Sequence, residues 1–205
     1  MVLKQTVCSF SGVYSDEGWS PDGDAILLDF SEIQSTSCYL DDSARAQLEN
    51  AIAPCPCRSI HWIDTGDYHY MSALWLQKLA SPARMVLFDN HPDDQAPAFG
   101  SDVLSCGSWM LEARANPLVR DDAPEVYLSI DLDVLCRDDA RTNWDQGEMR
   151  LPELLQRIDA VLAGKRLAGA DICGGLTIAQ GAIPEDLAVN SRTRRALERY
   201  LTGQF

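Results

Sequence analysis

Acidic and histidine side chains gather at three places in this chain, and each place follows or ends an apolar segment typical of a buried strand. In the segment DNHPD (89–93), Asp89, His91 and Asp93 alternate with other residues, so an extended backbone would direct all three side chains to one side. Two carboxylates held together in a buried place repel each other unless a cation lies between them. The spacing therefore predicts a site for a divalent metal ion.

The two other places carry the same kinds of side chain. Asp131 and Asp133 are two residues apart in the apolar segment EVYLSIDLDVL (125–135), and His69 ends the segment IDTGDYH (63–69). One pair of acids at a strand end is common in proteins without metals, but three such strand ends in one chain indicate a shared site. Oxygen and nitrogen donors without a thiolate favour manganese or another hard to borderline divalent ion. Four carboxylates and two imidazoles are too many for one ion, so we expect two ions that share carboxylates.

Strand-like and helix-like segments alternate along the chain, as they do in proteins with a parallel sheet. Apolar runs predict strands over residues 25–30, 59–64, 84–89, 125–135 and 167–173. Helical patterns cover residues 43–53, 70–80, 108–116, 151–163 and 185–201. This order predicts an α/β protein, a three-layer α/β/α sandwich with a mainly parallel central sheet, in a single domain over residues 1–205. Such sheets bind ligands at the carboxyl ends of their strands, where the three acidic segments fall.

The composition is that of an acidic globular protein. Its 31 acidic and 17 basic residues give a formal net charge of −14, and apolar residues make up 46% of the chain. This charge would repel phosphate groups, so we expect a small-molecule substrate and neither nucleic acid nor a membrane as partner. Seven irregularly spaced cysteines, with no evident signal peptide or long apolar span, favour a reduced, cytoplasmic protein.

Three short motifs resemble those of arginases and agmatinases, the ureohydrolase superfamily. DNHPD (89–93) is similar to their D-A-H-x-D motif, and GDYH (66–69) to G-G-D-H with one additional residue before the histidine. SIDLDVL (129–135) is similar to the first part of S-x-D-x-D-x-x-D-P, but the final D-P is replaced by residues 137–139 (RDD). The motifs occur in the same order, and GADI (169–172) resembles the last core strand of that family. The chain thus resembles a short, divergent member over about residues 60–200, whereas its first 55 residues match little.

This resemblance implies an arginase-like metal hydrolase domain with two divalent ions, for which manganese is expected. The bridging ligands would be Asp89 and Asp131, and the terminal ligands His69 with Asp93 on one ion and His91 with Asp133 on the other. A hydroxide that bridges the ions, oriented by Asp93, would attack the carbon of a guanidino or amidino group and break a linear C–N bond. Oligomers are common in the family, so a homo-oligomer is compatible with the resemblance.

The chain departs from the family where arginine is recognised. Arginine hydrolases carry an acid in a D-I-x-E context after the last strand, where this chain has Gly174. Many members also place a histidine between the D-A-H-x-D and S-x-D-x-D motifs. This chain has no histidine between DNHPD (89–93) and SIDLDVL (129–135). Free arginine is therefore not the expected substrate. Gln95 lies two residues after Asp93, where family members often contact the substrate, and is a candidate substrate-binding residue.

Two other functions stay open on the sequence. A deacetylase-like zinc amidohydrolase would share the fold and part of the site while using one metal, but the adjacent histidine pair typical of those enzymes is absent from this chain. A non-catalytic metal-binding protein would keep the ligands and lose the substrate pocket. Gly174 and the missing histidine between the motifs agree with that second alternative.

Several other conspicuous residues are expected to be structural. His61 lies inside a predicted strand and is expected to pack in the core, and Asp67 is expected to bind the amides of its loop. The thiols of Cys106 and Cys173 lie near the predicted site, but buried thiols usually serve as packing. The basic residues of the last helix are expected on its solvated face or in an oligomer contact: Arg192, Arg194, Arg195 and Arg199.

Overall fold

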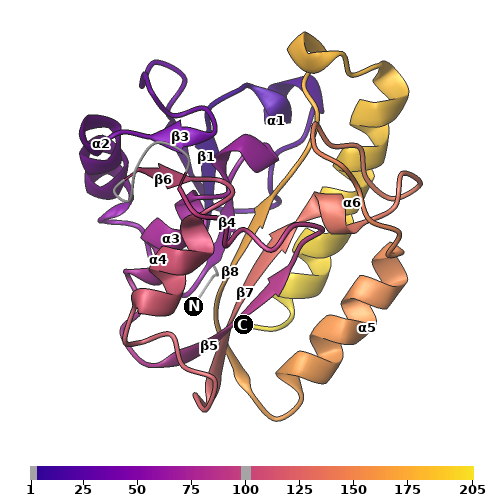
Figure 1. The fold of residues 1–205 in the computed structure, drawn as a ribbon. Coiled ribbons are helices and arrows are strands. Elements are labelled where there is room, and N and C mark those ends of the chain that lie inside the picture. Colours follow the sequence, from indigo (N-terminus) through magenta and orange to yellow (C-terminus); the bar gives the residue numbers. More distant parts are fainter. Residues whose placement is uncertain (1–3, 98–102) are drawn as a thin grey trace.

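The computed structural model describes residues 4–97 and 103–205. A sheet of six parallel strands runs through its centre in the order β2-β1-β4-β8-β7-β5 (Figure 1). The strands are β1 (Gln5–Ser9), β2 (Ala25–Asp29), β4 (Ile60–Trp62), β5 (Ala83–Phe88), β7 (Glu125–Asp131) and β8 (Arg166–Cys173). A separate antiparallel pair joins β3 (Tyr39–Leu40) to β6 (Leu104–Ser105). The predicted mainly parallel sheet is confirmed.

Helices cover both faces of this sheet. They are α1 (Val13–Asp16), α2 (Asp42–Ile52), α3 (Met71–Leu76), α4 (Trp109–Ala115), α5 (Leu151–Leu162) and α6 (Pro184–Thr202). Figure 1 shows α2, α3 and α4 on one side of the sheet, drawn at the left, and α5 and α6 on the other. The predicted three-layer α/β/α sandwich is therefore confirmed.

The sequence pattern of each long helix explains which face it buries. In α2, Asp41 caps the first turn by accepting a hydrogen bond from Ala44 N at 2.8 Å, and the residues facing the sheet recur every four positions at Ala44, Leu48 and Ile52. Helix α5 begins with Pro152 in its first turn, where the missing N–H costs nothing, and buries one face against the opposite side of the sheet.

Strand β7 separates two hydrophobic cores. All seven of its residues are buried, with Tyr127 in the core under α2, α3 and α4, and Val126, Leu128 and Ile130 in the core under α5 and α6. Because successive side chains of a strand point to opposite faces, Ser129 and Asp131 share the face of Tyr127. The polar end of β7 therefore emerges beneath the α3 and α4 layer.

Strand β1 is the main element that the sequence did not predict. It pairs with both β2 and β4, and its first residues Gln5 and Thr6 are buried although polar. The side chain of Gln5 accepts a hydrogen bond from Trp62 Nε1 at 2.8 Å and donates one to Glu198 at 2.6 Å. These partners, which are distant in sequence, supply the hydrogen bonds that the buried Gln5 side chain needs. The strand can therefore form without an apolar run.

Within the described residues, no helix has the length and apolar character needed to cross a bilayer. The seven cysteines are free thiols.

Candidate metal centre

The six predicted metal ligands come together at the carboxyl ends of neighbouring strands. His69 follows β4 through a single 3-10 turn (Gly66–Tyr68), Asp89 is the first residue after β5, and Asp131 is the last residue of β7. Their donor atoms form two compact groups, His69 with Asp89 and Asp93, and Asp89 with His91 and Asp133. Asp89 belongs to both groups, as a bridging ligand would.

The spacing of the donor atoms fits metal coordination. His69 Nδ1 lies 3.1 Å from Asp89 Oδ2, 3.0 Å from Asp93 Oδ2 and 3.6 Å from Asp131 Oδ2. His91 Nδ1 lies 2.8 Å from Asp133 Oδ2 and 3.6 Å from Asp89 Oδ1. Two donors that each lie about 2.1 Å from one ion are separated by about 3.0–3.4 Å in tetrahedral or octahedral geometry. The five distances between donor atoms run from 2.8 to 3.6 Å and lie around this range.

The electrostatics of these side chains also fit a cation. Asp89 Oδ2 is buried and accepts no hydrogen bond. Burial raises the pKa of Asp131 above its usual range. Burial, and then the charges of Asp131 and Asp89, raise the pKa of Asp133 to about 10. Burial opposes protonation of His69, yet the Cys173 thiol and the nearby carboxylates raise its pKa well above the usual value. Divalent cations at these donors would remove the need for added protons.

The backbone reaches this arrangement differently from the sequence-based expectation. The strand predicted over residues 125–135 is wrong at its end, because β7 stops at Asp131 and Asp133 lies in a 3-10 turn (Leu132–Val134). Asp131 caps that turn by accepting a hydrogen bond from Asp133 N at 2.9 Å. The extended alternation predicted for residues 89–93 is also wrong, since β5 ends at Phe88 and Asp93 has a left-handed φ of 46°. Turns rather than strand pleating direct these carboxylates inward.

A buried hydrogen-bond chain orients His69. Its Nε2 lies 2.9 Å from Ser129 Oγ, and that hydroxyl donates to Asp171 Oδ1 at 2.7 Å. Ser72 Oγ donates to the same carboxylate oxygen at 3.0 Å. Burial raises the pKa of Asp171 to about 6, so it is mostly ionised at neutral pH. Such outer partners fix the ring so that Nδ1 faces the carboxylates.

Asp93 is held by contacts that leave little freedom of rotation. Trp109 Nε1 donates to Asp93 Oδ2 at 2.6 Å, and Met110 N donates to the Asp93 carbonyl at 3.1 Å. The Trp109 ring also packs against His69, with ring centroids 4.8 Å apart. Trp109 therefore fixes both side chains at once.

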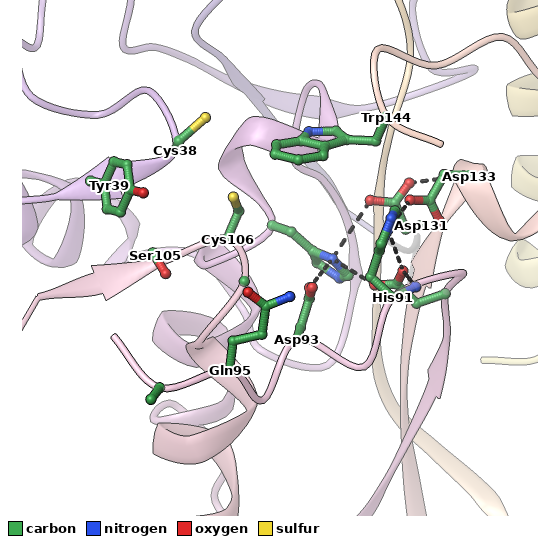
Figure 2. A pocket seen from close by; sticks show the side chains of 15 residues that line it. Cys38, Tyr39, His91, Asp93, Gln95, Ser105, Cys106, Asp131, Asp133 and Trp144 are labelled. Atoms are coloured by element: carbon green, nitrogen blue, oxygen red, sulfur yellow. Dashed lines mark hydrogen bonds and ion pairs between the residues drawn. The ribbon is translucent and has the colours of Figure 1, made fainter. Parts of the chain in front are cut away.

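A cavity of about 230 Å³ opens over the candidate ligands. Figure 2 shows His91, Asp131 and Asp133 on one side of it, with Trp144 lying across the site. The opposite wall consists of pocket residues from the loop before β3, from β3, from the segment after Asp93 and from the β6 region: Cys38, Tyr39, Gln95, Ser105, Cys106 and Gly107. Gln95 lines the cavity, and its contact with a substrate stays a prediction.

Trp144 is anchored to the loop that carries His69. Asp67 Oδ1 accepts hydrogen bonds from Trp144 Nε1 at 3.0 Å and from Asn143 Nδ2 at 2.8 Å. A Cβ atom on Gly66 would lie 2.8 Å from Trp144 Cδ1, so glycine is needed for this close approach. Asp67 joins two loops through its side chain.

Gly174 lies against the candidate ligand Asp131 and cannot be replaced by a larger residue without strain. Its φ of 98° is left-handed, and a Cβ atom would lie 2.6 Å from Asp131 Oδ1. Arg194 Nη2 donates to the Gly174 carbonyl, and Arg194 Nε forms a buried ion pair with Glu17 Oε2 at 2.6 Å. The expectation that Arg194 lies on a solvated face or in an oligomer contact is wrong, because its side chain is 0% exposed. The backbone at Gly174, where arginine hydrolases carry an acid, is therefore held in place, and this position offers no acidic side chain.

Cys173 is a site residue that the sequence-based reasoning treated as packing. It is fully buried, and its Sγ donates to Asp131 Oδ2 at 3.0 Å. His69, Asp131 and Cys173 form a third group of donors within 4.8 Å of one another. The signal was its place directly before Gly174 at the end of a predicted strand. Cys106 is half-buried and lines the cavity.

No family model matches this chain. A Thermotoga maritima protein without a described function is 28% identical in an alignment of 144 positions that covers 56% of this chain and 57% of that protein. The match therefore spans little more than half the length of either chain.

Solved structures match over nearly the whole chain. A hypothetical agmatinase from Burkholderia thailandensis has a TM-score of 0.62 and 16% identity, covering 98% of this chain and 85% of that one. Proclavaminate amidino hydrolase from Streptomyces clavuligerus has a TM-score of 0.66 and 12% identity, covering 98% and 92%. Trypanosoma cruzi formiminoglutamase, solved with Mn²⁺, has a TM-score of 0.66 and 7% identity, covering 100% and 94%.

These neighbours confirm the predicted resemblance to the arginase and ureohydrolase superfamily at the level of fold. The fold of this chain is the arginase-like α/β/α sandwich, and it includes residues 4–55, for which the sequence motifs gave no match.

Proposed function

We propose that this protein is a dinuclear-metal hydrolase that cleaves a linear C–N bond in a small guanidino or amidino compound. The observation that carries the proposal is the pair of His and Asp groups that share Asp89 at the carboxyl ends of parallel strands. The agmatinase, amidino hydrolase and formiminoglutamase named among the structural neighbours support this class of reaction.

In this proposal, His69 and Asp93 would hold one divalent ion and His91 and Asp133 would hold the other. Asp89 and Asp131 would be ligands shared by the two ions. Oxygen and nitrogen donors of this kind suit manganese. When bound, two such ions lower the pKa of a shared water, so that a nucleophile is available at neutral pH.

The chain's own residues supply positioning and proton handling. Asp93, locked by Trp109 at 2.6 Å, is the carboxylate proposed to orient the attacking water and accept its proton. Ser129 and Asp171 keep the His69 ring in the orientation that the site needs. Trp144 covers part of the cavity and limits access of bulk water to the reacting carbon.

The cavity points to a small substrate with a neutral tail. A volume of about 230 Å³ lies below the roughly 300–1,000 Å³ of typical ligand pockets. Among the described residues that line it, none is Lys or Arg, and its acids are the candidate metal ligands. A free α-carboxylate or α-ammonium group would therefore lack a charged side chain to pair with. Gln95, Ser105 and Cys106 offer uncharged polar contacts instead, so the proposed substrate is not free arginine.

The first test is metal content per chain, together with release of urea, ammonia or amine from a panel of guanidino, amidino and amide compounds. Protein reconstituted with manganese is expected to hold two ions and to turn over a member of the panel. Asp131→Asn, which keeps the shape of the side chain, should lose bound metal and activity. Asp138→Asn is the matched control, because this acid is 75% exposed on a loop.

Other results would contradict specific parts of the proposal. One ion per chain, most tightly zinc, would favour a deacetylase-like amidohydrolase. Two ions without turnover of any compound in the panel would favour a non-catalytic metal-binding protein. Folded protein that binds no metal would overturn the proposal altogether.

A further inference from the structure

We infer that the Cys173 thiolate is a ligand of the ion held by His69, and that this half of the centre therefore takes a thiophilic divalent ion, zinc above all, in preference to manganese. The inference rests on the proposed metal centre and extends it, because the ligand set read from the sequence contained only oxygen and nitrogen donors.

The position of Cys173 follows from strand pairing. Cys173 is the last residue of β8 and is the register partner of Asp131 at the end of β7. Neighbouring residues at the ends of parallel strands point to the same face when they are register partners. Cys173 Sγ accordingly lies 3.0 Å from Asp131 Oδ2, inside a group of donors that also includes His69.

A second observation points to an ion between these side chains. Asp89 Oδ2 is buried without a hydrogen bond and lies 3.1 Å from Nδ1 of His69, a residue that also belongs to the Cys173 group. The side chains of Asp89 and His69 are each 2% exposed, so water cannot satisfy that oxygen from bulk. His69 belongs to both groups, so a cation held by His69 and Asp131 would also contact the Cys173 thiol.

The surrounding backbone keeps the thiol in place. Gly174 packs so closely against Asp131 that a Cβ atom would come within 2.6 Å, and its carbonyl is held by buried Arg194. Cys173 therefore cannot move away from Asp131 without displacing a fixed turn.

The two halves of the centre then differ in chemistry. Asp89, His91 and Asp133 offer only oxygen and nitrogen donors, which manganese accepts. The His69 half adds a thiolate, and thiolates select zinc and other softer ions over manganese. On coordination the thiol proton leaves to solvent, since a coordinating thiol is deprotonated. The structure thus assigns different metal preferences to two sites that share a bridging carboxylate.

Cobalt(II) absorption tests the inference directly, because thiolate ligation of cobalt gives an intense near-ultraviolet charge-transfer band that oxygen and nitrogen ligands do not give. The metal-free full-length protein is titrated with Co²⁺ in four forms: wild type, Cys173→Ser, Cys173→Val and Cys106→Ser. Cys106→Ser is the matched control, because this thiol lines the same cavity but lies in none of the donor groups formed by described residues.

The band is expected in wild type and in Cys106→Ser, and should be absent from both Cys173 variants while they still bind cobalt. The preference of the Cys173 variants for zinc over manganese should also fall by about tenfold or more. Removing only an outer partner of a metal ligand already lowers metal affinity by about 10–100-fold. Cys173→Val keeps an apolar side chain of similar size, so it guards against a folding defect of the serine variant.

The failures are distinguishable. Cobalt bound to wild type without a charge-transfer band, or a band that survives in Cys173→Val, would overturn the thiolate ligand and leave the proposed hydrolase intact. Absence of cobalt binding in folded wild type would overturn both.

Discussion

The buried ion pair of Arg194 and Glu17 gives a stability prediction that can be worked from the structure. The two side chains are each 0% exposed and lie 2.6 Å apart, and the Arg194 guanidinium stacks over Tyr14 at 4.9 Å. Removing one partner of a fully buried pair leaves an uncompensated charge, which costs about 3–5 kcal/mol. We expect Arg194→Met to lower the free energy of unfolding by this amount at neutral pH.

Removing both charges should cost less than removing one. Buried pairs can often be replaced by apolar residues with little loss, so in Arg194→Met with Glu17→Leu the main remaining penalty is the Gly174 carbonyl without its donor. An unsatisfied buried acceptor costs about 1–3 kcal/mol. The double variant is therefore expected to be more stable than the Arg194→Met single variant.

The deficit of the single variant should also depend on pH. Burial raises the pKa of Glu17, and Arg194 opposes that rise. Without Arg194 the pKa rises further, so the folded state keeps a proton that the unfolded state releases. A carboxyl with a raised folded pKa contributes stability below its unfolded pKa and loses it as pH rises. The deficit is therefore expected to be smaller at pH 5 than at pH 7.

Urea unfolding followed by circular dichroism at both pH values measures these differences. Arg195→Met is the control, since this neighbouring arginine is exposed and its replacement should change stability by no more than about 0.5 kcal/mol. The reasoning is refuted if Arg194→Met costs less than about 1 kcal/mol, or if the double variant is no more stable than the single variant.

Two further predictions concern histidines. Burial lowers the pKa of His61 to about 3, so as pH falls below about 6.5 the unfolded state binds a proton that the folded state does not. The free energy of unfolding should therefore decline by about 1.4 kcal/mol per pH unit. Urea unfolding of His61→Gln should show a weaker decline of stability at acidic pH than wild type, and an equal decline would refute this. Ser129→Ala breaks the chain from His69 to Asp171, so calorimetry should show metal affinity about 10–100-fold weaker, against an unchanged Ser105→Ala, and equal affinities would contradict the proposed role.

The gathering of acids near the carboxyl ends of the central strands could be predicted because the signal is local in sequence. Apolar runs that lead to Asp89 and Asp131 indicate parallel strands, and parallel strands bring such acids to one edge of the sheet. The same reasoning could not give the turn geometry, because the 3-10 turn after Asp131 and the left-handed Asp93 depend on contacts such as the hydrogen bond from Trp109.

Other features were hidden because their partners are distant in the chain. Arg194 resembles its exposed neighbours on the last helix, and only the fold brings it to Glu17, 177 residues away. Strand β1 has no apolar run that would have predicted it, because it contains Gln5, a buried polar residue whose hydrogen-bond partners lie on β4 and α6. Cys173 became notable only when strand register placed it beside Asp131.

The position of Trp144 allows the candidate site to be monitored by tryptophan fluorescence. This indole is 42% exposed, whereas the other four tryptophans, Trp19, Trp62, Trp75 and Trp109, are at most 4% exposed. A dissolved quencher such as iodide therefore reaches one emitter, and that emitter lies with its ring centroid 6.1 Å from the His91 ring at the cavity mouth. A molecule that fills the cavity will shield Trp144 from iodide, so fluorescence can report when the cavity is occupied.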